Sequence, residues 1–169
     1  MTKVLLVDGY NVIHRTPPYD ALAADDLDAS RTALVSDVGA FAHGEWEATV
    51  VFDGAANPHS NGQPHRVAGV SVIFSAYGTE ADHVIESLSR TARDRGDEVL
   101  VVSSDAQTQW TVMGGGAMRM PAGEFGDELR EADRSWREHA PSGERTVRLE
   151  DLIDPAVKER LSRWARGES

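Results

Sequence analysis

Residues 3–9, KVLLVDG, form a short apolar run that ends in an Asp-Gly pair. Such a run predicts a buried strand that stops at a turn. Its near-continuous apolar character is typical of a strand that helices cover on both faces of a sheet. Three further apolar runs predict strands along the chain, at residues 49–52 (TVVF), 70–74 (VSVIF) and 98–103 (EVLVVS).

Segments with helical periodicity separate and follow these strands. Strands that alternate with helices indicate βαβ units and a parallel sheet. We therefore expect an α/β protein with three layers, α/β/α, and a central, mainly parallel sheet. Residues 54–69 are expected to form the longest irregular stretch, and residues 113–120 a glycine-rich turn followed by a short strand. The expected helices span residues 25–43, 79–95, 122–136 and 149–164, with a linker at residues 139–144.

The composition limits the classes of function. The 169 residues include 28 acidic and 17 basic side chains, for a net charge of −11, and no cysteine. A disulfide scaffold, thiolate metal sites and cysteine catalysis are therefore excluded. No apolar run reaches the length of a secretory signal or a membrane-spanning helix, so we expect a soluble, cytoplasmic protein with no membrane partner. The acidic balance argues against tight non-specific binding of nucleic acid, although a metal-binding carboxylate cluster would itself lower the net charge.

Aspartates follow three of the predicted strands, at Asp8, Asp53 and Asp105. Because the carboxyl ends of parallel strands lie at one edge of a sheet, we expect the three side chains at the same edge. Each of them taken alone is also explained as a turn former or a helix cap. Three carboxylates at one edge repel one another, however, unless a cation neutralises them.

Residues 78–82, GTEAD, open the second predicted helix at that same edge. One interpretation is a capping box, in which Thr79 is the N-cap and Asp82 is the acid three residues later. This interpretation leaves Glu80 unexplained. The alternative is that Glu80 and Asp82 join Asp8, Asp53 and Asp105 in one acidic pocket. Oxygen ligands of this kind suit Mg²⁺ or Mn²⁺, which activate water and stabilise phosphoryl displacement.

The opening LVDGYNVIH, residues 6–14, resembles the start of the YacP-like NYN-domain proteins of the PIN-like nuclease superfamily. The resemblance covers about the first three quarters of the chain, which we take as a nuclease domain over residues 1–137. Residues 138–169 are expected to form a C-terminal linker and a helix that packs on the domain or extends it. The order of residues 50–53, 78–82, 103–105 and 114–120 is similar to that family as well.

The resemblance implies a divalent-metal-dependent ribonuclease that cuts RNA phosphodiesters internally, including mRNA on the ribosome. Asp8, Asp82 and Asp105 would then hold Mg²⁺ or Mn²⁺, and Asp53 and Glu80 would bind the metal directly or support these ligands. Asn11 would orient water, metal or phosphate. The implied catalytic residues are Asp8, Asn11, Asp82 and Asp105. Because the protein is acidic, we expect weak affinity for naked single-stranded RNA and delivery by the ribosome or a protein partner.

Basic side chains near these motifs are candidate phosphate contacts, although solvated surface positions are the alternative for each of them. A phosphoacceptor receiver domain and a haloacid-type phosphatase both rely on a lysine late in the domain. The only lysines of the chain are Lys3 and Lys158, with none between them, so both classes of function are set aside. A catalytically inactive RNA- or ribosome-binding adaptor of the same fold stays as the second function. The candidate substrate contacts are His14, Arg15, Arg66 and Arg119.

Overall fold

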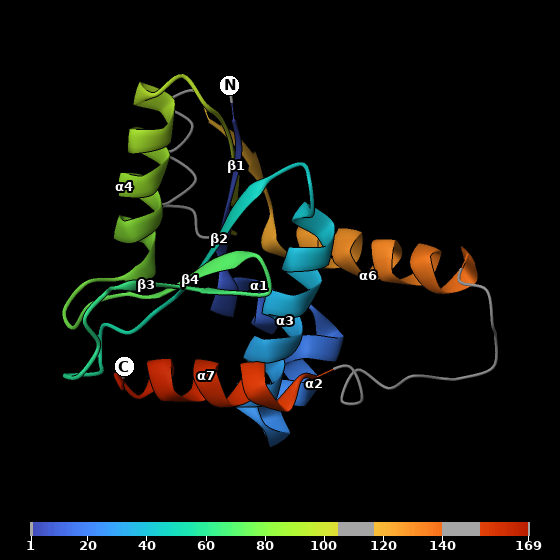
Figure 1. Cartoon of the computed structure of the whole chain (residues 1–169), viewed down its shortest axis with the longest axis horizontal. Helices are drawn as coiled ribbons and strands as arrows, with labels where there is room; N and C mark the ends of the chain where they lie inside the picture. Colours follow the sequence, from blue (N-terminus) through green and yellow to red (C-terminus); the bar gives the residue numbers. More distant parts are fainter. Residues whose placement is uncertain (1, 105–116, 140–152, 169) are drawn as a thin grey trace.

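The computed structural model describes residues 2–104, 117–139 and 153–168 (Figure 1). Six strands in these ranges form one sheet, in the order β3-β4-β2-β1-β5-β6. All neighbouring strands are parallel except β3, which runs antiparallel to β4 at one edge. The expected mainly parallel sheet is therefore confirmed. The strands are β1 (Lys3–Asp8), β2 (Glu47–Phe52), β3 (Pro64–Val67), β4 (Val70–Phe74), β5 (Glu98–Val102) and β6 (Met118–Met120).

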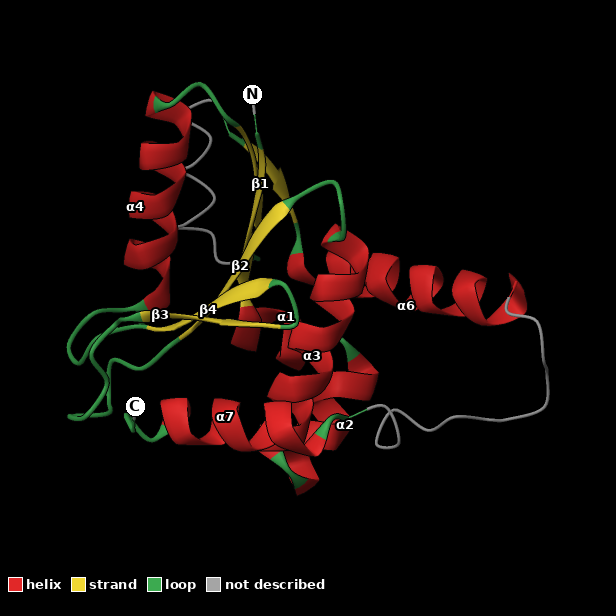
Figure 2. Cartoon of the chain, viewed as in Figure 1, coloured by secondary structure: helices red, strands yellow, loops and turns green. Residues whose placement is uncertain are grey.

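Helices cover both faces of the sheet, which confirms the three-layer α/β/α fold (Figure 2). Alternate residues of β1 point into two separate cores: Leu5 and Val7 into one, and Val4 and Leu6 into the other. The second core is closed by α4 (Ala81–Asp94), and the first by the remaining helices. These are α1 (Gly9–Arg15), α2 (Pro17–Asp25), α3 (Leu27–Ala42), α6 (Ala122–His139) and α7 (Pro155–Ala165).

Two parts of the chain differ from the sequence-based expectation. Residues 9–25 form α1 and α2, which no periodic pattern predicts, and α2 begins with Pro17 at a position where proline is tolerated. Residues 54–69 are not irregular throughout, because β3 lies within them and pairs with β4. Proline has no backbone N–H to donate to a neighbouring strand. Pro64 is tolerated because β3 is an edge strand, with a neighbour on one side only. The predicted helix at residues 149–164 is represented by α7, and residues 149–152 lie outside the described ranges.

The C-terminal helix α7 packs against α3 and against the segment that carries β3. Leu161 and Trp164 are buried, and the Trp164 ring stacks on His65 with centroids 4.2 Å apart. Burial and the positive charge of Arg160 lower the pKa of His65. Asn57 Nδ2 donates to the carbonyl oxygen of Ala165 at 2.9 Å. None of the described helices combines the length and apolar character that a membrane span requires.

An ion pair joins α7 to the start of α3. Asp26 is the N-cap of α3, where its carboxylate accepts a hydrogen bond from the Ala29 backbone N–H at 3.1 Å. The Lys158 ammonium donates to the other carboxylate oxygen at 2.6 Å. The hydrogen bond from Lys158, and to a smaller extent the one from Ala29, lowers the pKa of Asp26 below its usual 3.8. The bond to Asp26 raises the pKa of Lys158.

We expect Asp26→Asn to lower the free energy of unfolding by less than about 1 kcal/mol, because asparagine keeps the cap and only a half-exposed ion pair is lost. Asp26→Ala also removes the cap and should cost a further 1 kcal/mol or so. A lowered folded-state pKa stabilises the fold above pH 3.8, and this contribution disappears as the pH falls through the lowered value. Urea unfolding across this range tests the prediction, which is wrong if wild type and Asp26→Asn differ equally at acid and neutral pH.

Candidate active site

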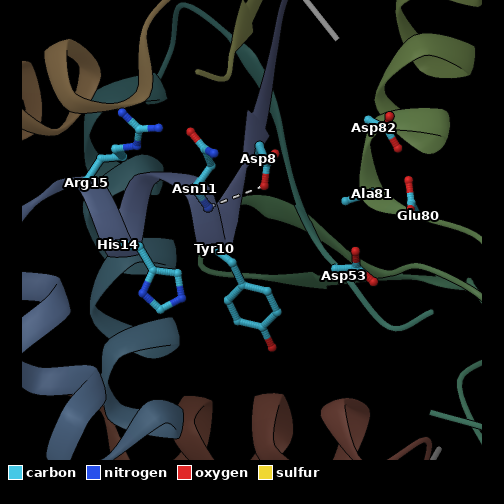
Figure 3. A pocket seen from close by; sticks show the side chains of 9 residues that line it. All are labelled: Asp8, Tyr10, Asn11, His14, Arg15, Asp53, Glu80, Ala81 and Asp82. Atoms are coloured by element: carbon cyan, nitrogen blue, oxygen red, sulfur yellow. Dashed lines mark hydrogen bonds between the residues drawn. The ribbon is translucent and has the colours of Figure 1, made fainter. Parts of the chain in front are cut away.

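A pocket of about 380 Å³ opens at the carboxyl edge of the sheet, where β1 passes into α1 and α4 begins (Figure 3). Four carboxylates from three separate segments line it: one ends β1, one follows β2, and two stand at the start of α4. The parallel pairing of β1 with β2, and of β2 with β4, brings these chain ends together. The lining residues are Asp8, Tyr10, Asn11, His14, Arg15, Asp53, Glu80, Ala81 and Asp82.

Asp8 is the N-cap of α1, and its Oδ1 accepts a long hydrogen bond of 3.4 Å from the Asn11 backbone N–H. Capping therefore explains this aspartate in part, but it occupies one oxygen of a carboxylate that lines the pocket. Gly9 allows α1 to begin directly after Asp8 and close to β2. A Cβ atom on Gly9 would lie 2.4 Å from Cε1 of Phe52, so only glycine fits this approach.

Asp53 is exposed at the rim of the pocket. Its Oδ1 accepts a hydrogen bond from the Ala55 backbone N–H at 2.8 Å, which is the local turn that a single aspartate after a strand predicts. Gly54 holds this turn against the end of β4, where its N–H donates to Ser75 Oγ at 2.9 Å. The turn thus fixes the carboxylate at the sheet edge beside α4.

The start of α4 contains no capping box. Glu80, not Thr79, is the N-cap, and no side chain caps the helix. Asp82 instead turns toward its neighbour: its Oδ1 accepts from the His83 backbone N–H at 2.9 Å and lies 3.3 Å from His83 Nδ1. Both acids therefore stand at a helix N-terminus, whose exposed N–H groups favour negative charge.

The donor set of this edge fits a hard divalent cation. Glu80, Asp82 and His83 each offer one ligand atom, and these atoms lie within 4.8 Å of one another. In the described part of the chain, no lysine or arginine forms an ion pair with Asp53, Glu80 or Asp82. These three carboxylates are thus not neutralised by a lysine or arginine of the described ranges. Oxygen donors in this arrangement suit Mg²⁺ or Mn²⁺.

His83 is a residue that the sequence reasoning did not select. Two thirds of its side chain is exposed, as expected for an isolated histidine, and it belongs to the potential ligand cluster through its contact with Asp82. The only sequence signal is its position directly after Asp82 in a helix that begins with two acids.

Asn11 connects the pocket to the loop that follows β5. Its Oδ1 accepts a hydrogen bond from the Ser104 backbone N–H at 2.9 Å. Ser104 Oγ in turn accepts from the backbone N–H of Ala122, at the start of α6, at 2.8 Å. Asp105 itself lies outside the described residues, but the residue before it is bonded to a side chain of the pocket.

Two of the four candidate phosphate contacts line the pocket. Figure 3 shows His14 and Arg15 on the far side of Asp8 from Asp53, Glu80 and Asp82. His14 and Arg15 are exposed, and His14 Nδ1 lies 3.2 Å from Asp20 Oδ1.

The other two candidates lie away from this pocket, at opposite edges of the sheet. Arg66 is in β3 and donates to the carbonyl oxygen of Gly69 at 3.3 Å, whereas Arg119 is in β6. Neither lines the pocket. Four strands, β4, β2, β1 and β5, lie between them, so the two arginines do not act together on one phosphate at the acidic cluster.

Comparison with known proteins extends the similarity beyond the opening motif. The sequence model of the YacP-like NYN domain matches residues 5–166. This match continues through α7, so the similarity extends beyond the first three quarters of the chain, whereas the domain division near residue 137 stays a prediction. The protein YacP of Bacillus subtilis (strain 168) is 32% identical over 179 residues, which cover 98% of each chain.

Solved structures agree with this sequence match. A crystal structure of a mutant of Rae1 (YacP) from Bacillus subtilis has a TM-score of 0.64 and 27% identity, over 95% of this chain and 98% of that one. A second crystal structure of Rae1 (YacP) from the same organism has a TM-score of 0.65 and 29% identity, over 80% of this chain and 78% of that one. The similarity therefore includes the sheet and helices that build the pocket.

Proposed function

This chain belongs to the YacP-like NYN domain family, and on that basis we propose that it is a cytoplasmic, divalent-metal-dependent endoribonuclease acting on single-stranded RNA. The observation that carries the proposal is the pocket in which four carboxylates from separate segments meet beside two basic side chains. An RNA phosphate entering such a pocket meets repulsion from the acids, which a bound cation converts into attraction.

In this proposal the acids bind the metal, and the other polar side chains of the pocket contact water or phosphate. Asp8, Asp82 and Asp105 would hold Mg²⁺ or Mn²⁺, with Asp53 and Glu80 beside them. When bound, the metal supplies an activated water and neutralises charge that develops on the phosphodiester. Asn11 holds the chain at Ser104, next to Asp105, and leaves its Nδ2 donors to orient water or phosphate.

Arg15 and His14 would hold the phosphates that flank the cut. Arginine is suited to this role because its planar guanidinium can pair two phosphate oxygens at once. The protein nevertheless carries a net charge of −11, so counterion release contributes little to its affinity for free RNA. We include in the proposal that the ribosome or a protein partner delivers mRNA, because tethering raises the effective substrate concentration without any basic surface.

Cleavage of a circular single-stranded RNA tests this function. A circle has no ends, so its conversion to a linear product demonstrates internal cutting. We expect the wild-type protein to linearise the circle with Mn²⁺ or Mg²⁺, to stop in excess EDTA, and to recover when metal is restored.

The same assay with single-stranded DNA of equal sequence measures the preference for RNA. Cleavage that persists in EDTA contradicts the metal dependence. Retention of the RNA on the protein without any cleavage, with either metal, supports the inactive adaptor in place of the enzyme.

A further inference from the structure

Tyr10 forms part of the pocket wall but has no role in the function proposed above. It lies in the first turn of α1, between the glycine that allows the close approach to β2 and Asn11. Its half-buried ring lines the pocket and packs against Phe52, with centroids 5.0 Å apart and planes tilted by 49°. Figure 3 shows the ring between His14 and Asp53. A neutral aromatic ring is neither a ligand for Mg²⁺ nor a partner for phosphate.

A buried arginine fixes the hydroxyl of this ring. Arg31, in α3, is only 6% exposed, and its Nη1 donates to the Tyr10 hydroxyl at 3.0 Å. Its other terminal nitrogen pairs with Asp28, whereas Nε has no hydrogen-bond partner among the described residues. Burial of a guanidinium is strongly unfavourable unless hydrogen-bonded or oppositely charged partners compensate it. Arg31 also lies over the Phe74 ring, 5.8 Å from its centroid, so it joins Tyr10 to the core as well as to Asp28, and its bond to the hydroxyl fixes the orientation of the Tyr10 ring.

This support continues from α3 to the C-terminal helix. Ser162 Oγ donates to Asp28 Oδ2 at 3.1 Å, and Arg166 Nη1 donates to Ser162 Oγ at 2.7 Å. The contacts therefore run from α7 through Asp28 and Arg31 to Tyr10. They fix the hydroxyl end of a ring that also lines the pocket.

We propose that Tyr10 is a stacking surface for a nucleobase of the bound RNA, and that Arg31 is the residue that positions it. The inference rests on the proposed ribonuclease function. A rigid aromatic ring stacks on any base, which is worth roughly 1–3 kcal/mol and does not depend on net charge. Stacking of this kind supplies affinity that an acidic protein cannot gain from phosphate contacts. Because Tyr10 and Asp8 line the same pocket, a base on this ring places its neighbouring phosphate near the carboxylates.

Cross-linking of the wild-type protein tests the contact without any substitution at Tyr10. Single-stranded oligoribonucleotides carry 5-iodouridine at one position at a time and are irradiated with Mg²⁺ on an excess of the protein, because a cross-linked fragment identifies the contact even after cleavage. We expect a position-dependent cross-link that mass spectrometry assigns to Tyr10. Cross-links that form only at other residues overturn the stacking role.

Kinetics with substituted proteins give an independent measurement. Tyr10→Leu keeps apolar bulk but removes the ring, and should raise KM for RNA about 5- to 150-fold with a smaller effect on kcat. Tyr10→Phe is the matched control, because it keeps the ring and loses only the bond to Arg31; it should raise KM about as much as Arg31→Met and much less than Tyr10→Leu. Arg31→Met should weaken the Tyr10 cross-link and raise KM without lowering kcat, whereas a purely structural role would lower the active fraction instead.

The outcomes separate this inference from the proposed function. If the wild type cuts RNA but Tyr10→Leu keeps its KM, the stacking role is wrong and the nuclease stands. If the wild type does not cut RNA but cross-links through Tyr10, the binding surface stands and the nuclease is wrong.

Discussion

Asp8→Asn is expected to slow metal-dependent RNA cleavage by more than about 100-fold, since loss of a group that merely supports a metal ligand already costs 10- to 100-fold. The substitution is nearly isosteric and acts on a residue that also caps α1. Asparagine is as good an N-cap as aspartate, so the fold should be retained. What is lost is one negative charge of the cluster that would hold the cation. Single-turnover cleavage rates and Mn²⁺ titration calorimetry measure the two consequences, and thermal unfolding checks the fold.

Asp94→Asn is the matched control for this experiment. Asp94 is the last residue of α4; it is exposed and lies outside the pocket. Its substitution removes the same charge from the protein as Asp8→Asn. We expect it to cut RNA at the wild-type rate. An Asp8→Asn protein that cuts equally well would show that Asp8 is a cap and no metal ligand. Equal losses in both variants would attribute the effect to net charge.

The main elements of the fold are predictable from sequence because strands β1, β2, β4 and β5 are marked by local runs of apolar residues. Residues 4–7 are all apolar, and burial by helices on both faces is what such a run requires. By contrast, α1 is a single short helix whose formation depends on its packing against Phe52 and on the cap supplied by Asp8. Likewise β3 exists because β4 offers it an edge, not because its own residues favour a strand. These elements depend on tertiary contacts, and periodicity alone does not predict them.

The same distinction applies to the site. The meeting of Asp8 and Asp53 follows from a topological rule, since both come at the carboxyl ends of parallel strands. The partners of the other side chains follow from no such rule. Asn11 accepts a hydrogen bond from Ser104, 93 residues later, and the buried Arg31 in α3 donates one to Tyr10 in α1. Sequence shows which chemical groups are available, but the pairing of distant groups needs the folded chain.

Asn11→Ala is expected to lower the cleavage rate about 10- to 100-fold, which is typical for residues that orient metal ligands. Alanine removes the acceptor for the Ser104 backbone N–H and thereby the anchor of the chain just before Asp105. We expect kcat to fall more than KM rises, because the substitution misplaces a group of the metal site and leaves Arg15 and Tyr10 in place. Hydrogen exchange at the Ser104 amide reports the lost bond directly.

Asn11→Asp separates the two functions of this side chain. A carboxylate still accepts from the Ser104 N–H, so protection of that amide from exchange should persist. The variant nevertheless loses the Nδ2 donors and adds a negative charge to a pocket that already holds four carboxylates. If Asn11 acts mainly by anchoring the loop, Asn11→Asp cuts faster than Asn11→Ala; if its donors orient water or phosphate, both variants are equally slow. Exchange at Ser104 that is unchanged in Asn11→Ala would contradict the anchoring role in either case, because the bond to Asn11 would then not be what holds that amide.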